Sequence, residues 1–303
     1  MFIVEQKAYR HHLIKITTMV SLLMKLKRKG LALPITKDKQ DLCNCISTML
    51  KQEEQYLCYD YMQVIKTKKE GVINASCRSK VTRWILQTVR RANLRSETAI
   101  MAVSYLDRFL CSTSSPRARK ARCDRRQYQL VAMTSLYMAI KINEPNEMDA
   151  DTISQLSRGF HSAEDITSCE RDMLSSLRWK VQGPTPLQFI NYMLELFQED
   201  NKSSARSVTA SAVCKLHYLS QRQTELATED YAFVPIRGSK IAIASIVNAL
   251  LMLPREDCSA QERIQFVQVI SDTFQADVDS PLMKAMRRRL LEKYTKSLRC
   301  KLP

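Results

Sequence analysis

Apolar residues recur every three or four positions along most of the chain, the pattern of helices that bury one face. From residue 77 onward this pattern predicts two successive groups of five helices. The first group is expected at 77–92, 97–111, 124–143, 149–157 and 163–178, and the second at 185–198, 204–226, 237–252, 260–275 and 280–298. No run of alternating apolar and polar residues lies between hairpin turn pairs, so the predicted fold class is all-α.

Polar residues, glycines and prolines mark the expected ends of these helices. Ser96, Asp124 and Ser162 precede apolar runs and are predicted N-caps, because their side chains can accept hydrogen bonds from first-turn amides. The segment GPTP at 183–186 separates the two groups, and its threonine and second proline suit the start of a new helix. This break, together with a length of 303 residues, predicts two domains.

The predicted organisation has four parts. These are a partly helical N-terminal extension at 1–73, a first bundle at 74–182, a second bundle at 183–298 and a tail at 299–303. Residues 1–37 hold one acid, Glu5, among several basic residues, which resembles a transit peptide only weakly because the segment has a single serine. A loosely docked extension is the favoured interpretation.

Charge changes the picture of the partners. The chain has 47 lysines and arginines against 31 acids, a net charge of +16, and the excess gathers at 25–29, 66–69, 117–126 and 287–289. Such clusters suit nucleic acid, acidic proteins or import receptors, and they also suit a solvated basic surface. No apolar run approaches the roughly 18 residues of a membrane span, so no membrane partner is expected.

The ten cysteines are dispersed and none forms a Cys-x-x-Cys pair. This usage is typical of reduced thiols inside cells, and most of them are expected to be buried. Only four histidines are present and none lies near the cysteines at ligand spacing, so no metal and no cofactor are expected.

Asp107 lies within an apolar helical run, AVSYLDRFL at 102–110. Its position at the margin of the apolar stripe predicts burial, and a buried carboxylate needs a cationic partner. Arg108 points away around the helix, so Arg78 at the start of the preceding helix is the candidate. The alternative places Asp107 at a solvated edge of the helix.

Five motifs occur in order over residues 77–189: CRSKVTRWILQTV, SETAIMAVSYLDRFLC, QLVAMTSLYMAIKINE, CERDMLSSLRW and PTPLQF. Together they resemble the cyclin box of the cyclin family. The resemblance implies two five-helix bundles and an internal ion pair at Arg78 and Asp107. It also implies a regulatory subunit without catalysis of its own, which binds a cyclin-dependent protein kinase and completes that kinase's active site. The absence of P-loop, kinase glycine loop, GxSxG and HExxH motifs agrees with this expectation.

The resemblance also implies where the kinase binds. The family's Lys and Glu that hydrogen-bond kinase backbone match Lys141 and Glu170, and Met138 and Ile142 are expected to supply apolar area beside them. Glu144 follows in the same segment and is assigned to the same contact. Without the resemblance, Lys141 and Glu170 would be read as ordinary surface charges.

A substrate-docking groove is implied on the first helix of the box. Its matching positions are Cys77, Lys80, Val81, Trp84, Gln87 and Gln129. Lys80 replaces an apolar residue, Gln87 replaces an acid and Arg83 replaces an aspartate, so conventional RxL peptides, which are basic, are expected to bind poorly. The alternative is that Val81 and Trp84 simply pack the bundle.

The segment RARKARCDRR at 117–126 is expected to be an accessible connection between helices. Arg117, Arg119, Lys120 and Arg122 are candidates for nuclear import or for contact with acidic substrates, and a solvated loop is the alternative. A cyclin of this kind is expected in the nucleus and the cytoplasm.

The subtype stays open, because LxCxE and KEN motifs are absent. The intact LDRFL segment and the paired boxes favour cell-cycle control. The competing hypothesis is a nucleic-acid-binding protein like the transcription factors of the TFIIB type, which share the cyclin fold. Those factors carry a zinc ribbon of two CxxC pairs that this chain lacks, and its basic clusters do not follow one helix face, so nucleic acid is disfavoured.

Overall fold

A computed structural model describes residues 38–63, 72–145, 148–157, 159–200 and 210–299. Every regular element in this part of the chain is a helix, as the sequence predicted. Its α-helices are α2 (Lys39–Glu53), α3 (Ala75–Arg91), α4 (Ser96–Cys111), α5 (Pro116–Cys123), α6 (Arg125–Asn143), α7 (Ala150–Leu156), α8 (Ala163–Ser176), α9 (Pro186–Asp200), α10 (Ala210–Glu229), α11 (Gly238–Met252), α12 (Ala260–Phe274) and α13 (Pro281–Arg299), with short 3-10 helices η1 (Glu54–Tyr56) and η2 (Tyr231–Phe233).

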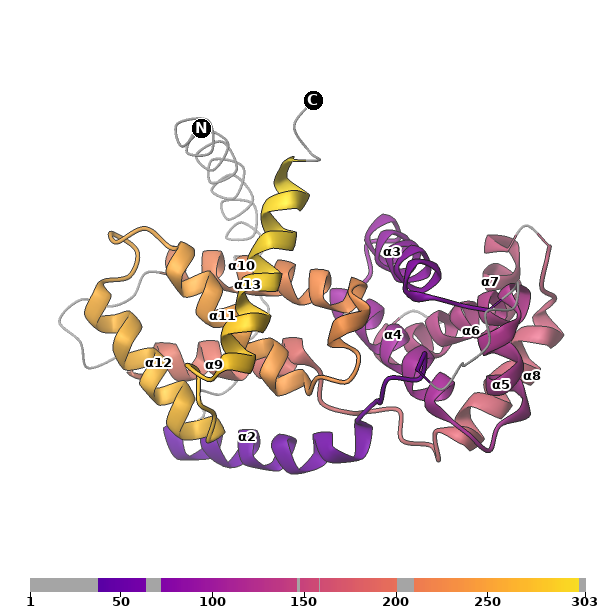
Figure 1. Cartoon of the computed structure of the whole chain (residues 1–303), viewed down its shortest axis with the longest axis horizontal. Coiled ribbons are helices and arrows are strands. Elements are labelled where there is room, and N and C mark those ends of the chain that lie inside the picture. Colours follow the sequence, from indigo (N-terminus) through magenta and orange to yellow (C-terminus); the bar gives the residue numbers. More distant parts are fainter. Residues whose placement is uncertain (1–37, 64–71, 146–147, 158, 201–209, 300–303) are drawn as a thin grey trace.

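The helices form two bundles, each around its own core (Figure 1). In the first bundle α4 is the central helix, and α3, α5 and α6 pack around it. In the second, α11 is central and is covered by α9, α10, α12 and α13. Both central helices are apolar on nearly all sides, which is the pattern of a helix surrounded by others rather than one lying on a surface.

The first bundle contains a helix that the sequence did not predict. Residues 117–126 were expected to be a loop, but α5 occupies most of this segment. Its buried face contains Ala118 and Ala121, both 0% exposed, together with Arg122. Apolar periodicity does not predict this helix, because small alanines between basic residues do not form an apolar stripe.

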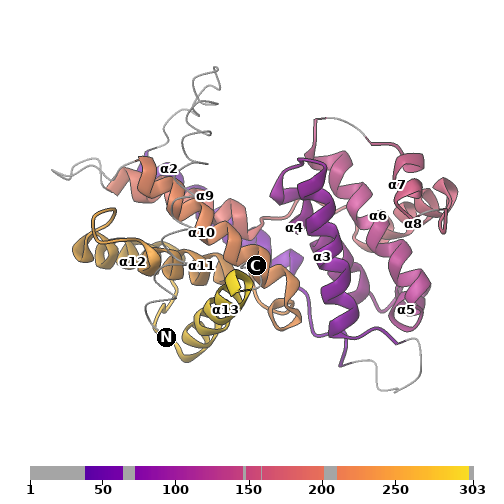
Figure 2. The same ribbon diagram turned by 90° about the horizontal axis from the view of Figure 1, so that it is seen from above.

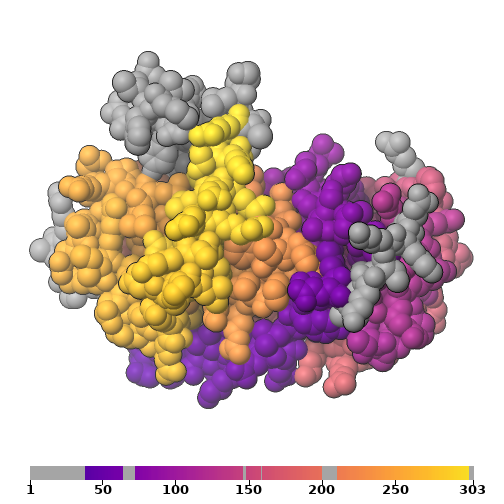
Figure 3. All heavy atoms as spheres, viewed as in Figure 1, coloured from indigo at the N-terminus to yellow at the C-terminus, as the bar shows by residue number. Residues whose placement is uncertain are grey.

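Helix α2 belongs to the segment predicted as a partly helical N-terminal extension at 1–73, and its indigo surface runs along the lower edge of the second bundle (Figure 3). Leu42 and Ile46 lie in the core of the second bundle, where α2 packs against α9 and α12 (Figure 1). The chain then passes through η1 and places Tyr61 in the core of the first bundle. The expectations for residues 1–37, for the start of the helix predicted at 204–226 and for the last four residues lie outside the described part.

Two of the three predicted N-caps are confirmed. Asp124 accepts a hydrogen bond from the Arg126 amide at 2.8 Å, and Ser162 forms a reciprocal capping box with Asp165. The prediction for Ser96 was wrong, since α4 begins at Ser96 itself and its N-cap, Arg95, makes no side-chain cap.

The connection between the bundles is fixed on both sides. Pro186 opens α9, as predicted, and the Thr185 hydroxyl accepts a hydrogen bond from the Gln188 amide at 3.2 Å. At Gly183 a side chain would overlap the ring of Tyr56, so the absence of a Cβ lets η1 lie directly against the connection. The Tyr105 hydroxyl also donates to the Val181 carbonyl at 2.7 Å.

The two bundles also meet through α3, α4 and α10, which lie side by side where the bundles touch (Figure 2). Glu225 of α10, 5% exposed, accepts hydrogen bonds from Arg90 of α3 and Ser96 of α4. Arg222 adds a third contact to the same carboxylate at 2.7 Å. Burying one carboxylate among two guanidinium groups gives this contact a specific geometry.

Candidate functional site

Arg78 and Asp107 form a buried ion pair, as the sequence predicted. The Arg78 guanidinium donates from Nε to Asp107 Oδ1 at 2.8 Å and from Nη2 to Oδ2 at 2.6 Å. The two residues are 2% and 5% exposed. Burial opposes the charged form of Arg78, but the Asp107 carboxylate outweighs it and leaves the pKa of Arg78 raised. Such low exposure indicates a structural role for the pair.

Two further groups complete the polar cluster around this pair. The Tyr61 hydroxyl donates to Asp107 Oδ1 at 2.9 Å, and Arg78 Nη1 donates to the Thr228 carbonyl at 3.0 Å. Burial raises the pKa of Tyr61, and the charge of Asp107 adds to the effect, so the hydroxyl remains a donor. The cluster therefore joins the segment before α3, the first bundle and the second bundle at one point.

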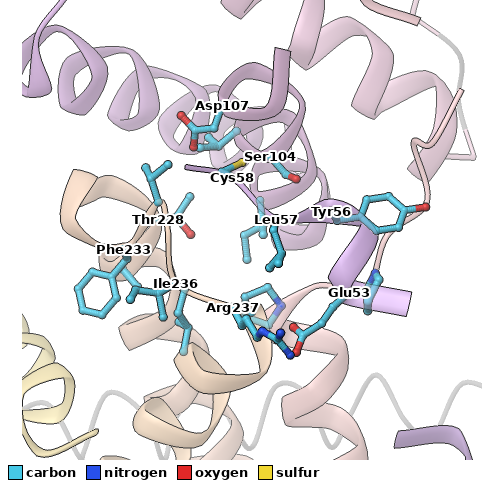
Figure 4. A pocket seen from close by; sticks show the side chains of 18 of the residues that line it. Glu53, Tyr56, Leu57, Cys58, Ser104, Asp107, Thr228, Phe233, Ile236 and Arg237 are labelled. Carbon is cyan, nitrogen blue, oxygen red and sulfur yellow. The ribbon is translucent and has the colours of Figure 1, made fainter. Parts of the chain in front are cut away.

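Next to this cluster, a small cavity lies between the bundles (Figure 4). Its lining includes Leu57, Cys58, Phe233 and Ile236, and Arg237 and Glu53 point toward one another at its edge. Its volume of about 130 Å³ is well below the roughly 300 Å³ at which ligand pockets begin. The cavity is therefore a gap where two bundles and η1 meet, too small for a cofactor.

Glu53, at the edge of this cavity, caps the start of α11. Its carboxylate is 3% exposed and accepts hydrogen bonds from the amide and the hydroxyl of Ser239, in the first turn of α11. A negative charge at a helix N-terminus interacts favourably with the free amides there. Burial nevertheless outweighs these contacts and raises the pKa of Glu53 above its ordinary value.

Lys141 and Glu170 meet on the surface of the first bundle. Lys141 Nζ of α6 donates to Glu170 Oε1 of α8 at 2.9 Å, and the same ammonium lies 4.8 Å from the ring centroid of Tyr137. Burial lowers the pKa of Lys141, but the hydrogen bond and charge of Glu170 prevail and raise it, which keeps Lys141 in its charged form. The Lys141 side chain is 41% exposed. The structure thus joins two residues that the sequence placed on separate helices.

The apolar residues expected beside this pair are arranged differently. Met138 is 1% exposed and belongs to the core, so the prediction that it offers contact area was wrong. The middle of α6, from Leu130 to Ile140, is buried against α4, α5 and α8, and its exposed residues lie in its first and last turns. Ile142 lies in the last turn and is half-buried against the core.

Glu144 makes contacts within the chain through one of its carboxylate oxygens. Its Oε1 accepts a hydrogen bond from the Arg95 amide at 2.9 Å and a second from the Thr98 hydroxyl. It therefore caps the start of α4 from a distant segment. Both contacts use the same carboxylate oxygen, and the assignment of Glu144 to the kinase contact stays a prediction.

Sequence reasoning missed Trp179, which is 73% exposed just beyond the end of α8. Arg178 and Trp179 both have left-handed backbones, with φ of 52° and 58°. Non-glycine residues rarely adopt this conformation, and it costs roughly 1 kcal/mol or more for each. The only sequence signal was a bulky aromatic residue directly after an amphipathic helix. A large exposed aromatic on the bundle that carries Lys141 and Glu170 is a candidate anchor for a protein partner.

The residues assigned to the docking groove largely come together. Cys77, Lys80, Val81 and Trp84 of α3 and Gln129 of α6 line one groove of about 470 Å³. Gln87 does not line it, because it lies one turn farther along α3 and faces solvent. The structure adds Arg125 and Leu156, the latter from α7, which the sequence did not assign.

Two of the four basic residues assigned to an accessible loop are held within the fold. Arg122 is 8% exposed and donates to the carbonyls of Leu110 and Ser112, so it fixes the end of α4. Arg117 donates to Asp172 Oδ2 at 2.5 Å and to the Ser168 hydroxyl. Arg119 and Lys120 remain exposed, so the prediction of four free cations was wrong.

The described residues contain no group of three or more His, Cys, Asp or Glu side chains placed to hold a metal ion. None of the helices described combines the length and the apolar character that a membrane crossing requires.

Comparison with known families gives two matches that cover most of the chain. Residues 44–182 match the family described as the N-terminal domain of cyclin, and residues 184–299 match the C-terminal domain of cyclin. The boundary between the two matches coincides with the connection at Gly183.

Individual relatives are distant. Cyclin-A3-1 of Oryza sativa subsp. japonica is 22% identical over 227 residues, which are 75% of this chain and 56% of the relative. Cyclin-D3-1 of the same plant is 27% identical over 61% of this chain and 55% of its own length. The G2/mitotic-specific cyclin-B2 of Oryzias latipes is 24% identical over 74% of this chain and 58% of the relative. The chain therefore spans somewhat more than half the length of these relatives.

Solved structures agree on the fold. A viral cyclin from herpesvirus saimiri superposes with a TM-score of 0.55 at 13% identity, over 76% of this chain and 96% of the viral one. A chain of the CAK complex of Chaetomium thermophilum superposes with a TM-score of 0.50 at 12% identity, over 85% of this chain and 76% of that one.

Proposed function

Because the chain belongs to the cyclin family, we propose that it binds and activates a cyclin-dependent protein serine/threonine kinase and acts in cell-cycle control. It is proposed to be a regulatory subunit without catalysis of its own. The observation that carries this proposal is the Lys141 and Glu170 pair, which is joined by a 2.9 Å contact and whose side chains are 41% and 13% exposed.

The pair has bonding capacity left for a partner. An ammonium has three donors and a carboxylate about four acceptor positions, and their mutual contact uses one of each. The remaining donors and acceptors suit backbone carbonyls and amides of a second protein. Since Lys141 and Glu170 already neutralise each other in part, covering them costs less than covering an isolated charge.

Trp179 supplies the kind of apolar anchor that such a polar contact needs. Exposed tryptophan is enriched among the residues that dominate binding energy at protein interfaces. Its 73% exposure in the free chain leaves most of its surface available for burial against a kinase. We infer that Trp179 takes part in the kinase contact together with Lys141 and Glu170, and that substrates dock in the groove between α3 and α6.

A second candidate function, the binding of nucleic acid, has only the net charge of +16 behind it. Localisation to the nucleus and the cytoplasm is proposed with the kinase-regulating function. Arg119 and Lys120 are the exposed cations of α5 available to an import receptor.

The proposal is tested by recovering the tagged chain from cells and identifying the protein kinases that accompany it by mass spectrometry. The recovered kinase should phosphorylate a serine or threonine peptide faster with the chain than without it. A chain that recovers no protein kinase, or one that leaves the rate unchanged, would contradict the proposal. A parallel titration with duplex DNA at rising salt covers the second candidate, since nucleic-acid binding weakens steeply with salt.

A further inference from the structure

The groove between α3 and α6 has apolar walls and a cationic rim. Val81, Trp84, Met133 and Leu156 contribute apolar side chains, and Leu156 is 44% exposed. A volume of about 470 Å³ is large enough for two or three side chains of an extended peptide.

The charged residues of the groove are all of one sign. Lys80 and Arg125 line it, and no aspartate or glutamate is among its described lining residues. Asp124, the acid next to Arg125 in the chain, is turned to the amides of Arg126 and Gln127 as the N-cap of α6. Within the described part of the chain, the groove therefore offers no carboxylate that could receive a basic peptide.

Lys80 and Arg125 are also free of acidic partners among the described residues, unlike most cations around them. Arg78 on the same helix is paired with Asp107, Arg90 with Glu225, and Arg83 lies 3.6 Å from Glu229. Two unpaired cations at the rim of an apolar groove favour a ligand that brings its own negative charges.

We propose that this groove docks a peptide in which an apolar side chain stands next to aspartate, glutamate or phosphorylated residues. The apolar side chain enters between Trp84 and Leu156, while the acids contact Lys80 and Arg125. The inference rests on the proposed function in one respect, since such a peptide would belong to a substrate of the bound kinase. The proposed groove prefers negatively charged peptides, whereas a groove that receives RxL peptides prefers positively charged ones.

The test uses two synthetic peptides of twelve residues and the full chain. One peptide has two aspartates and a leucine in adjacent positions, and its twin has two arginines in place of the aspartates. Fluorescence anisotropy at moderate salt should show the aspartate peptide binding at least tenfold more tightly. Equal affinity, or preference for the arginine twin, would overturn the proposal.

Charge reversal in the groove provides the decisive comparison. Lys80→Glu with Arg125→Glu should reverse the preference, whereas Lys51→Glu with Arg91→Glu, an identical change of charge on exposed positions elsewhere, should preserve it. If both variants alter the preference equally, the effect is one of net charge and the proposal fails. Leu156→Ser changes a side chain that the fold leaves exposed, and it should weaken the binding of the aspartate peptide several-fold. An unchanged affinity would contradict the apolar part of the proposal.

The outcome stays separate from that of the proposed function. Kinase recovery should be the same for Lys80→Glu with Arg125→Glu as for the unaltered chain, because Lys141 and Glu170 are intact. A chain that recovers its kinase but binds neither peptide would overturn the docking inference alone.

Discussion

The Arg78 guanidinium holds both carboxylate oxygens of Asp107, at 2.8 Å and 2.6 Å, and its third nitrogen donates to a carbonyl of the other bundle. One buried side chain thus contributes to the first bundle and to the contact between bundles. The charge inside the apolar run of α4 is a part of the scaffold.

Removing either partner of this pair should destabilise the chain strongly. Arg78→Ala or Asp107→Ala leaves an uncompensated buried charge, which typically costs about 3 to 5 kcal/mol. Urea denaturation measures the free energy of unfolding, with Lys80→Ala on the exposed side of α3 as the control, expected to change it by less than about 0.5 kcal/mol. Unchanged midpoints in both alanine variants would contradict a structural role.

The double variant Lys141→Ala with Glu170→Ala should lose the kinase but stay folded. A surface ion pair contributes little to stability, about 0 to 1 kcal/mol, whereas charges covered at an interface can be worth about 2 kcal/mol or more. Pull-down and thermal unfolding of the same preparation separate the two effects. Full kinase recovery by the double variant would remove these residues from the contact.

Trp179→Ala should weaken kinase binding at least tenfold and leave the stability of the free chain nearly unchanged. The side chain is mostly exposed, so its loss removes little buried area from the fold. Phe160→Ala, at another exposed aromatic that is 62% accessible, is the matched control and should keep full binding. Equal loss in the two variants would point to a general effect rather than to an anchor at Trp179.

Glu53 predicts a pH dependence with a definite sign. Its pKa in the folded chain lies above the ordinary value of 4.5, so its protonated form is favoured by folding. The contribution is fully present below the unfolded-state pKa and is lost as pH rises through the folded-state pKa. Glu53→Gln is neutral throughout, and the unaltered chain should therefore lose stability relative to it as the pH rises above 4.5 and through the folded-state pKa. The measurement is urea denaturation of both proteins at several pH values across this range. A stability difference that stays constant with pH would contradict the prediction.

The basic residues of α5 should have different effects on stability and on nuclear accumulation when they are replaced. Arg122→Gln should destabilise the first bundle by about 1 to 3 kcal/mol, because it leaves buried carbonyls at the end of α4 unpaired. Arg119→Gln with Lys120→Gln should leave stability unchanged and reduce nuclear accumulation of a fluorescent fusion. Unchanged nuclear accumulation of the Arg119→Gln with Lys120→Gln variant would show that import depends on another segment.

Local signals explain which parts of the fold were predictable from the sequence. The boundaries of α6 and α8 follow from Asp124 and Ser162, whose caps involve residues only two or three positions away. The docking of α2 on the second bundle could not be predicted in this way, because the apolar pattern of a helix does not identify the distant surface that it covers.

The candidate site shows the same division. Periodicity made Arg78 a candidate partner for Asp107 but left a solvated edge open, and the resemblance to the cyclin box decided for the pair. Met138 was misplaced because α6 is enclosed on nearly every side, and apolar periodicity cannot tell an enclosed helix from one with a free face. The engagement of Glu144 with the start of α4 depends on how two segments approach in space, for which the sequence has no signal.

The position of α2 determines how this protein can be divided. The second bundle shares its core with Leu42 and Ile46, which precede the first bundle in the chain. A fragment beginning at residue 183 would therefore fold with an apolar trench along α9 and α12 and would be prone to associate with itself. Two domains that are consecutive in sequence are in this respect interlocked, and only a polypeptide that includes α2 contains the complete second core.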